Sequence, residues 1–209
     1  MTSRTASLAD IPVIRAADLK APTGGGSWGF SNLIGILSEI SEEIPSGALS
    51  FMAEIIADSQ GQKEPVAWVA GEESVFFPPD LSQRGVDLSA LAVIRAGGES
   101  ESLIAAEWLL RSGAFGLVVV DCEGNWKVED AILGRIQRIA DRNQCAVVFL
   151  TRKRQADPSL GSRITLRGCI RRAGTGNGPL AVDILTLKDK RSNSGSRQNR
   201  QYNGPAGMH

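Results

Sequence analysis

The chain has 209 residues, 42% of them hydrophobic, which is enough for one α/β domain with a sizeable core. Lys+Arg and Asp+Glu each number 23, so a uniformly basic protein is excluded but a local basic patch is not. The single histidine, His209, argues against a histidine base or a histidine metal site. Cys122, Cys145 and Cys169 lack metal-ligand spacing, and no signal-like or membrane-spanning apolar run is present, so we expect free thiols in a cytoplasmic protein.

Residues 1–23 form an N-terminal segment without a strong hydrophobic period. A glycine-rich stretch follows over residues 24–29, around Trp28. A phosphate cradle is one interpretation of this stretch. It lacks a Lys-Ser/Thr pair and leads into a predicted strand instead of a helix, so a flexible entry loop is favoured.

A strand over residues 35–40, a loop over 41–47 and an amphipathic helix over 48–58 create the setting of a phosphate-binding loop. Its chemistry is absent, because the first glycine is an acid, one amide is lost to proline, and the lysine and the Mg²⁺-binding hydroxyl are replaced by apolar residues. The sequence therefore predicts a degenerate nucleotide loop made of Glu42, Pro45, Ser46, Gly47, Ala48 and Leu49.

The following β-α units predict a mainly parallel sheet with right-handed crossovers. The helix over residues 100–112 has Leu103, Ile104, Ala106, Leu110 and, in part, Trp108 along it, with Glu99 or Ser100 as its cap. The predicted strands are 65–70, 91–94, 117–120 and 145–150, and the helices are a short one ending near residue 85, 100–112 and 128–142.

Asp121 follows an apolar run, residues 117–120, that suits a strand covered on both faces. A carboxylate at the carboxyl end of a central parallel strand lies where open α/β sheets bind ligands, and in a nucleotide hydrolase it would help to hold Mg²⁺. A simple strand cap is the alternative interpretation, and both stay open.

Beyond residue 151 the pattern changes to an antiparallel hairpin, with a turn over residues 174–178 and a return strand over 180–187. Arginines alternate with apolar residues over 163–171, and this stripe either contacts a phosphate backbone or is a solvated sheet face. Residues 191–209 are expected to form a disordered basic tail. The candidate DNA contacts are Arg152, Lys153, Arg154, Arg163, Arg167 and Arg171.

The segments GILSEISEEIPSGALSFMAEIIADSQ, PVAWVAGEE, DLSQRGVDLSALAVIRA and RSGAFGLVVVD resemble the core of RecA in order and spacing. Within that superfamily the chain is most similar to ImuA proteins, through GGG before Trp28, FPPDLSQRGVDLSALAVIRA, RSGAFGLVVV and LAVDILTLK. The resemblance covers about residues 24–190. It implies a RecA-like core: a mainly parallel sheet flanked by helices, with a C-terminal antiparallel hairpin.

The same resemblance implies a role in SOS mutagenesis after DNA damage. The partners it implies are an ImuB-like Y-family polymerase homologue and an error-prone C-family DNA polymerase, with DNA and RecA as further candidates.

Matched by position, Ala48 and Leu49 replace the Lys and Thr of the RecA phosphate loop. Glu72 matches the glutamate that activates water, Asp121 the Mg²⁺-associated aspartate, and Arg152 a glutamine that senses the γ-phosphate. Two acidic positions are therefore kept, whereas the residues that bind the phosphates are lost, and such a pair of carboxylates should repel nucleotide. No cofactor is expected.

Three function classes follow: a non-catalytic adaptor of a translesion polymerase complex, a DNA-binding module or recombination regulator, and a weak ATPase with a non-standard loop. The missing lysine argues against the ATPase, and the neutral total charge argues against DNA binding as the sole function. Phe76 and Phe77 are the candidate partner contact, because exposed aromatic side chains mark interaction sites. The alternative, that both fold inward, stays open.

Overall fold

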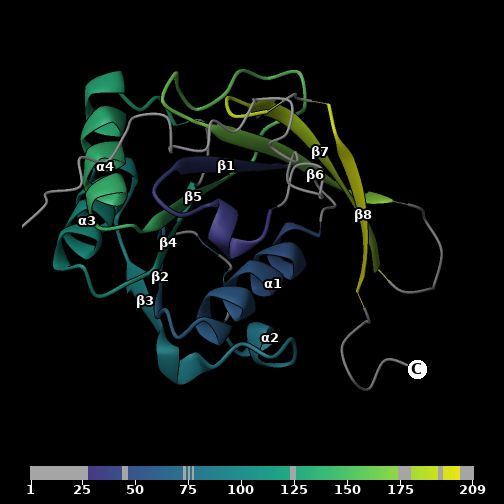
Figure 1. Ribbon diagram of the computed structural model, residues 1–209, viewed down its shortest axis with the longest axis horizontal. Helices are drawn as coiled ribbons and strands as arrows, with labels where there is room; N and C mark the ends of the chain where they lie inside the picture. The colour runs from purple at the N-terminus through teal and green to yellow at the C-terminus, as the bar shows by residue number, and fades with distance from the viewer. Residues whose placement is uncertain are drawn as a thin grey trace, which may run out of the picture.

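The computed structural model describes residues 28–43, 47–72, 74, 76, 78–122, 126–173, 180–192 and 195–202, with the backbone alone at 79 and 80. Within them, one eight-stranded sheet has the order β3-β2-β4-β5-β1-β6-β7-β8. Strands β1 to β6 are parallel, and β7 and β8 extend the sheet in antiparallel fashion. The predicted α/β class, mainly parallel with an antiparallel C-terminal part, is confirmed (Figure 1).

The order of elements predicted for residues 35–150 is also confirmed, with small shifts of their ends. One shift concerns the site: β1 continues through Glu42, which therefore belongs to a strand and not to a loop. The strands are β1 (Leu37–Glu42), β2 (Val66–Ala70), β3 (Leu91–Arg95), β4 (Leu117–Cys122), β5 (Ala146–Thr151), β6 (Leu166–Ala173), β7 (Leu180–Asp189) and β8 (Arg197–Tyr202). The helices are α1 (Ala48–Gly61), α2 (Pro79–Ser82), α3 (Glu99–Ser112) and α4 (Asp130–Arg142), with 3-10 turns at Phe30–Asn32 and Leu88–Ala90.

Two apolar layers cover the two faces of the sheet. The first lies beneath α1 and includes Trp28, Phe51 and Trp68, and the second lies beneath α3 and α4 and includes Leu110 and Phe149. Every residue of β2, β4 and β5 is buried. This agrees with their continuous apolar runs, which are typical of parallel strands covered on both faces.

Helix α3 differs from its prediction in two respects. Its N-cap is Gly98, with φ of 143°, and Glu99 is the first helical residue, so neither Glu99 nor Ser100 is the cap. The prediction also grouped Ile104 and, in part, Trp108 with the apolar residues along this helix, but these side chains are 52% and 68% exposed. The buried face of α3 is instead formed by Ser102, Leu103, Ala106, Glu107 and Leu110.

The expected disordered tail is wrong for residues 197–202, which form β8 and pair with β7 from Leu180–Tyr202 to Leu185–Arg197. Tertiary contacts explain this strand: Tyr202 packs against the first apolar layer, and its hydroxyl donates a hydrogen bond to Glu54 of α1 (2.8 Å). Residues 1–27, the turn at 174–178 and residues 203–209 lie outside the described part of the chain. No helix among the described residues is long and apolar enough to cross a membrane.

Candidate functional site

The carboxyl ends of β1, β4 and β5 lie side by side and bring together three residues that sequence analysis singled out. Glu42 ends β1, Asp121 lies near the end of β4, and Arg152 directly follows β5. Arg152 Nε lies 3.9 Å from Glu42 Oε1, and the charges of both residues act on Asp121. The chain leaves β1 through α1 on one face and β4 through α4 on the other, so this edge is the place where open α/β sheets bind ligands.

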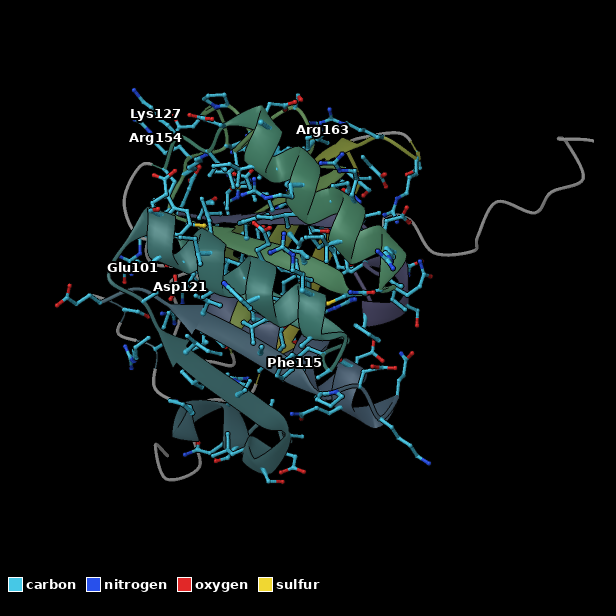
Figure 2. The ribbon with its side chains drawn as sticks, turned by 90° about the vertical axis from the view of Figure 1, so that its left-hand side faces the viewer. Glu101, Phe115, Asp121, Lys127, Arg154 and Arg163 are labelled. Carbon is cyan, nitrogen blue, oxygen red and sulfur yellow. The ribbon has the colours of Figure 1, made fainter. Side chains whose placement is uncertain are left out.

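Asp121 is 8% exposed and accepts a hydrogen bond from Ser74 Oγ (2.8 Å). Burial raises its pKa above the ordinary value, and Glu42 adds to this effect, while the Ser74 hydrogen bond, Arg152 and Arg95 oppose it. Arg95 also donates to the carbonyl oxygen of Ser74 (3.0 Å) and so holds the segment that supplies the serine. Asp121 lies toward the left in Figure 2, as do Lys127 and Arg154.

The start of α1, where a nucleotide phosphate would bind, is packed against β7. Gly47 is the N-cap of α1, and a Cβ atom built on it would lie 2.2 Å from Val182 Cγ2. Ala48 is buried, and Leu49 packs against the first apolar layer. Gly47 is therefore required for close packing, a use of glycine that needs no phosphate. Pro45 and Ser46 lie outside the described residues.

Glu72, the second predicted acidic position, is exposed on the segment after β2. The structure thus brings Glu42, Asp121 and Arg152 together. Among the described residues, no group of three or more His, Cys, Asp or Glu side chains is arranged to hold a metal ion.

Glu39, in the middle of β1, is a buried carboxylate that was not among the predicted site residues. Glu39 is 0% exposed and accepts hydrogen bonds from Thr151 Oγ1 (3.1 Å) and from the backbone N–H of Leu160 (2.8 Å). Its oxygens also lie 3.4 Å from Lys153 Nζ and 3.8 Å from Arg167 Nε. Two cations and two hydrogen bonds compensate the cost of burying this charge. The network ties residues 152–165 to the sheet.

Arg167 is 4% exposed, so its predicted place in an exposed arginine stripe is wrong. Its Nε–H donates to Ser41 Oγ (3.0 Å), and its guanidinium donates to the carbonyl oxygens of Asp157 and Arg154. The physical reason is that residues 152–165 fold over this part of the sheet. The signal in the sequence was the acid Glu39 in the middle of β1, since a buried charge needs partners.

The other candidate DNA contacts have different surroundings. The Lys153 side chain is 10% exposed and is engaged by Glu39, so it too faces inward. Arg154 and Arg163 are 83% and 54% exposed and pair with acids at 3.8 Å and 3.2 Å. Arg171 is exposed on β6. Arg154, Arg163 and Arg171 thus remain accessible, and their contact with DNA stays a prediction.

Phe76 folds inward. It is 5% exposed and stacks on Trp68, with ring centroids 4.0 Å apart and an interplanar angle of 4°. Phe76 is therefore wrong as a partner contact, and Phe77 lies outside the described residues. The exposed large hydrophobic side chains of the described part are Leu88, Ile104 and Trp108.

Comparison with known proteins supports a distant relationship. No protein-family model matches the chain. The RecA protein of Chlorobium limicola is 32% identical over 87 residues, which make up 42% of this chain and 25% of that RecA. The match thus spans a quarter of the relative's length. Together with a mainly parallel sheet flanked by helices, it indicates a RecA-like α/β protein.

Proposed function

We propose that the protein is a RecA-like accessory protein that does not use ATP and acts as an adaptor in an error-prone translesion DNA synthesis complex, in the manner of ImuA proteins. One observation carries this proposal. At the edge of the sheet where a nucleoside triphosphate would bind, Glu42 forms an ion pair with Arg152 beside the buried Asp121.

Electrostatics explains why this arrangement disfavours nucleotide. Arg152, a cation beside the vestigial site, is already paired with Glu42, and Ala48 stands where the phosphate loop of RecA has its lysine. Bound phosphates would meet the charges of Glu42 and Asp121 at close range, where like charges repel by about 1 kcal/mol or more. A phosphoryl-transfer site needs the opposite balance, with cations around the transferred group.

Isothermal titration calorimetry with Mg-ATP tests the first half of the proposal. We expect no binding heat up to millimolar nucleotide, and no hydrolysis above the buffer rate. Asp121→Ala should behave in the same way as the unmodified protein. Micromolar affinity that is lost in Asp121→Ala would show a working nucleotide site and contradict the proposal.

The second half of the proposal concerns the partner, which by resemblance is an ImuB-like Y-family polymerase homologue associated with a C-family DNA polymerase. Because Phe76 is buried, the test moves to Ile104 and Trp108, which are exposed one turn apart on α3. Large exposed apolar side chains in neighbouring positions mark protein-binding surfaces. We expect the interaction to be independent of ATP.

A binding assay with such a partner uses Ile104→Ser/Trp108→Ser against Leu88→Ser, which removes an exposed leucine elsewhere on the surface. The double variant should weaken binding at least tenfold, as expected for a tryptophan at the centre of an interface. Leu88→Ser should have little effect, and all variants should melt like the unmodified protein. Binding that strictly requires ATP would overturn the adaptor function as proposed.

Nucleic-acid binding is a second candidate function, and the distribution of charge favours it. Residues 152–209 contain 12 basic and 3 acidic side chains, a net charge of +9, whereas residues 1–151 contain 11 and 20, a net charge of −9. A protein that is neutral in total thus has a strongly basic C-terminal part. Such a part supplies the sequence-independent attraction to a phosphate backbone.

One side of the C-terminal strands gathers part of this charge. We call it the open face, because the apolar layer beneath α3 and α4 contains no residue of β6, β7 or β8. In the antiparallel register Asp183 lies opposite Arg171 and Asn199, and Leu185 lies opposite Arg197, and residues directly opposite share a side of the sheet. The open face comprises Arg171, Asp183, Leu185, Arg197, Asn199 and Gln201.

The single acid of the open face serves to orient its cations. Asp183 is buried and accepts hydrogen bonds from Arg197 and from Asn199 Nδ2 (3.1 Å), and these bonds lower its pKa. Arg171, Arg197, Asn199 and Gln201 remain exposed. One carboxylate between two guanidinium groups leaves a net positive surface with side-chain amides beside it.

Fluorescence anisotropy with a labelled oligo-dT tests this second function. We expect weak, sequence-independent binding that falls steeply between about 50 and 200 mM salt. Arg171→Gln should lower the salt slope by about one unit. Affinity that is the same at low and high salt, or no binding at low salt, would leave the open face as a solvated surface.

A further inference from the structure

Glu43 directly follows β1, and its carboxylate lies at the border of the open face. Its Oε1 accepts a hydrogen bond from the backbone N–H of Gln155 (2.8 Å) and lies 4.0 Å from Cys169 Sγ. An open cavity of about 600 Å³ adjoins this carboxylate. The cavity is lined by Glu43, Arg154, Gln155, Ala156, Arg167 and Leu187.

Two arginines line the same cavity as this carboxylate. Arg154 and Arg167 line the cavity with it, Arg154 extending into solvent and Arg167 fixed by its bonds to the chain. Burial raises the pKa of the Cys169 thiol and Glu43 raises it further, whereas Arg167 and Arg171 lower it, so all three charges act on this sulfur. A backbone N–H and guanidinium groups that line one cavity are donors of the kind that proteins use for phosphate.

We propose that this cavity accepts a phosphate group of single-stranded nucleic acid and that Glu43 is its built-in competitor. The proposal rests on the nucleic-acid-binding function above and adds its regulation. A phosphate can use the Gln155 N–H and the rim arginine only when the Glu43 carboxylate moves away from them. Glu43 therefore weakens binding, and neutralising it strengthens binding.

The preference for single-stranded over duplex nucleic acid is inferred from two apolar side chains near the cavity. Leu185 and Leu187 are half-buried on β7, and neither belongs to the two apolar layers of the core. Unpaired bases present faces that such side chains contact, whereas a duplex hides these faces in its stack. The exposed amides of Asn199 and Gln201 supply hydrogen bonds for sugars or base edges.

The test compares Glu43→Gln with Glu64→Gln by anisotropy at low salt, with labelled oligo-dT and with a duplex of the same length. The amide introduced by Glu43→Gln keeps an oxygen for the Gln155 N–H, so the segment keeps its anchor. Glu64 is an exposed acid just before β2, toward the opposite end of the sheet, and its variant removes the same charge. We expect Glu43→Gln to bind oligo-dT about five- to tenfold tighter, and Glu64→Gln to change affinity less than about twofold.

The outcomes separate the two proposals. Equal affinities of Glu43→Gln and Glu64→Gln, with salt-dependent binding by the unmodified protein, would overturn the competition but keep the nucleic-acid function. Equal gains on duplex and single strand would overturn the single-stranded specificity. Absence of binding by every variant would overturn both proposals, and binding by Glu43→Gln alone would support a strong form of the competition.

Discussion

The two ends of the sheet differ in charge, cover and packing. The parallel strands β3, β2, β4, β5 and β1, in their order across the sheet, are covered on both faces. The edge of this part that would bind nucleotide contains paired and buried charges. From β6 to β8 the strands are antiparallel, one side is the open face, and the surrounding sequence is strongly basic. The comparison teaches that the excess of acidic side chains lies in the sequence that builds the covered part, whereas the excess of basic side chains lies in the other.

Residues 152–165 join the two regions, and Glu39 is their anchor. Glu39→Ala should lower the free energy of unfolding by about 3–5 kcal/mol, because Lys153 and Arg167 would be left as buried charges without their acid. Urea denaturation measures the loss, and trypsin should cleave after Arg152 to Arg154 faster than in the unmodified protein. A loss below about 1 kcal/mol, with unchanged proteolysis, would show that the two regions do not depend on this anchor.

The covered region should be the more sensitive to loss of an aromatic side chain. Phe76→Ala should cost about 3 kcal/mol because it removes a ring stacked on the buried Trp68. Trp108→Ala is the matched control and should stay within about 0.5 kcal/mol, since its ring is 68% exposed. Thermal and urea melts measure both. Equal losses would mean that α3 is packed more closely than its exposure indicates.

Gly47 marks the contact between the regions, where the start of α1 meets β7. Gly47→Ala should cost about 1–3 kcal/mol, because the new Cβ would lie 2.2 Å from Val182 Cγ2 and force this buried side chain to move. The double variant Gly47→Ala/Val182→Ala removes the clash and should recover part of the loss. No recovery would show that Gly47 is needed for its backbone and not for close approach.

The sequence was a good guide to the covered region and a poor one to the other. Continuous apolar runs predicted β2, β4 and β5, and the strand–loop–helix pattern correctly located Gly47 at the start of α1. Strand β8 has no such run. It forms through pairing with β7 and through the contact of Tyr202 with Glu54, which the local sequence does not reveal. Arg167 looked like an exposed arginine because its acid, Glu39, is 128 positions earlier in the chain, and its cover comes from a loop.

Asp121 offers the smallest but most specific test of the idea that the covered edge is a former ligand site. Burial raises the pKa of Asp121, so the folded state holds its proton more tightly than the unfolded chain does. The stability from this group is therefore complete below the ordinary carboxyl pKa of 3.8 and is lost as pH rises through the raised pKa. Asp121→Asn removes this loss, keeps an oxygen for the Ser74 hydroxyl, and should gain in relative stability on going from pH 3.5 to pH 7.

The measurement is the difference in urea stability between Asp121→Asn and the unmodified protein at the two pH values. Asp130→Asn is the control of opposite sign, because hydrogen bonds from Ser162 and Arg163 lower the pKa of this exposed carboxyl. Its variant should lose relative stability over the same interval. If Asp121→Asn shows no gain, or loses stability as Asp130→Asn does, then Arg152 and Ser74 outweigh burial at Asp121. The charges at this edge would then balance one another, and Asp121 would be an ordinary member of an ion cluster. The edge would not be a former ligand site that has lost its cation.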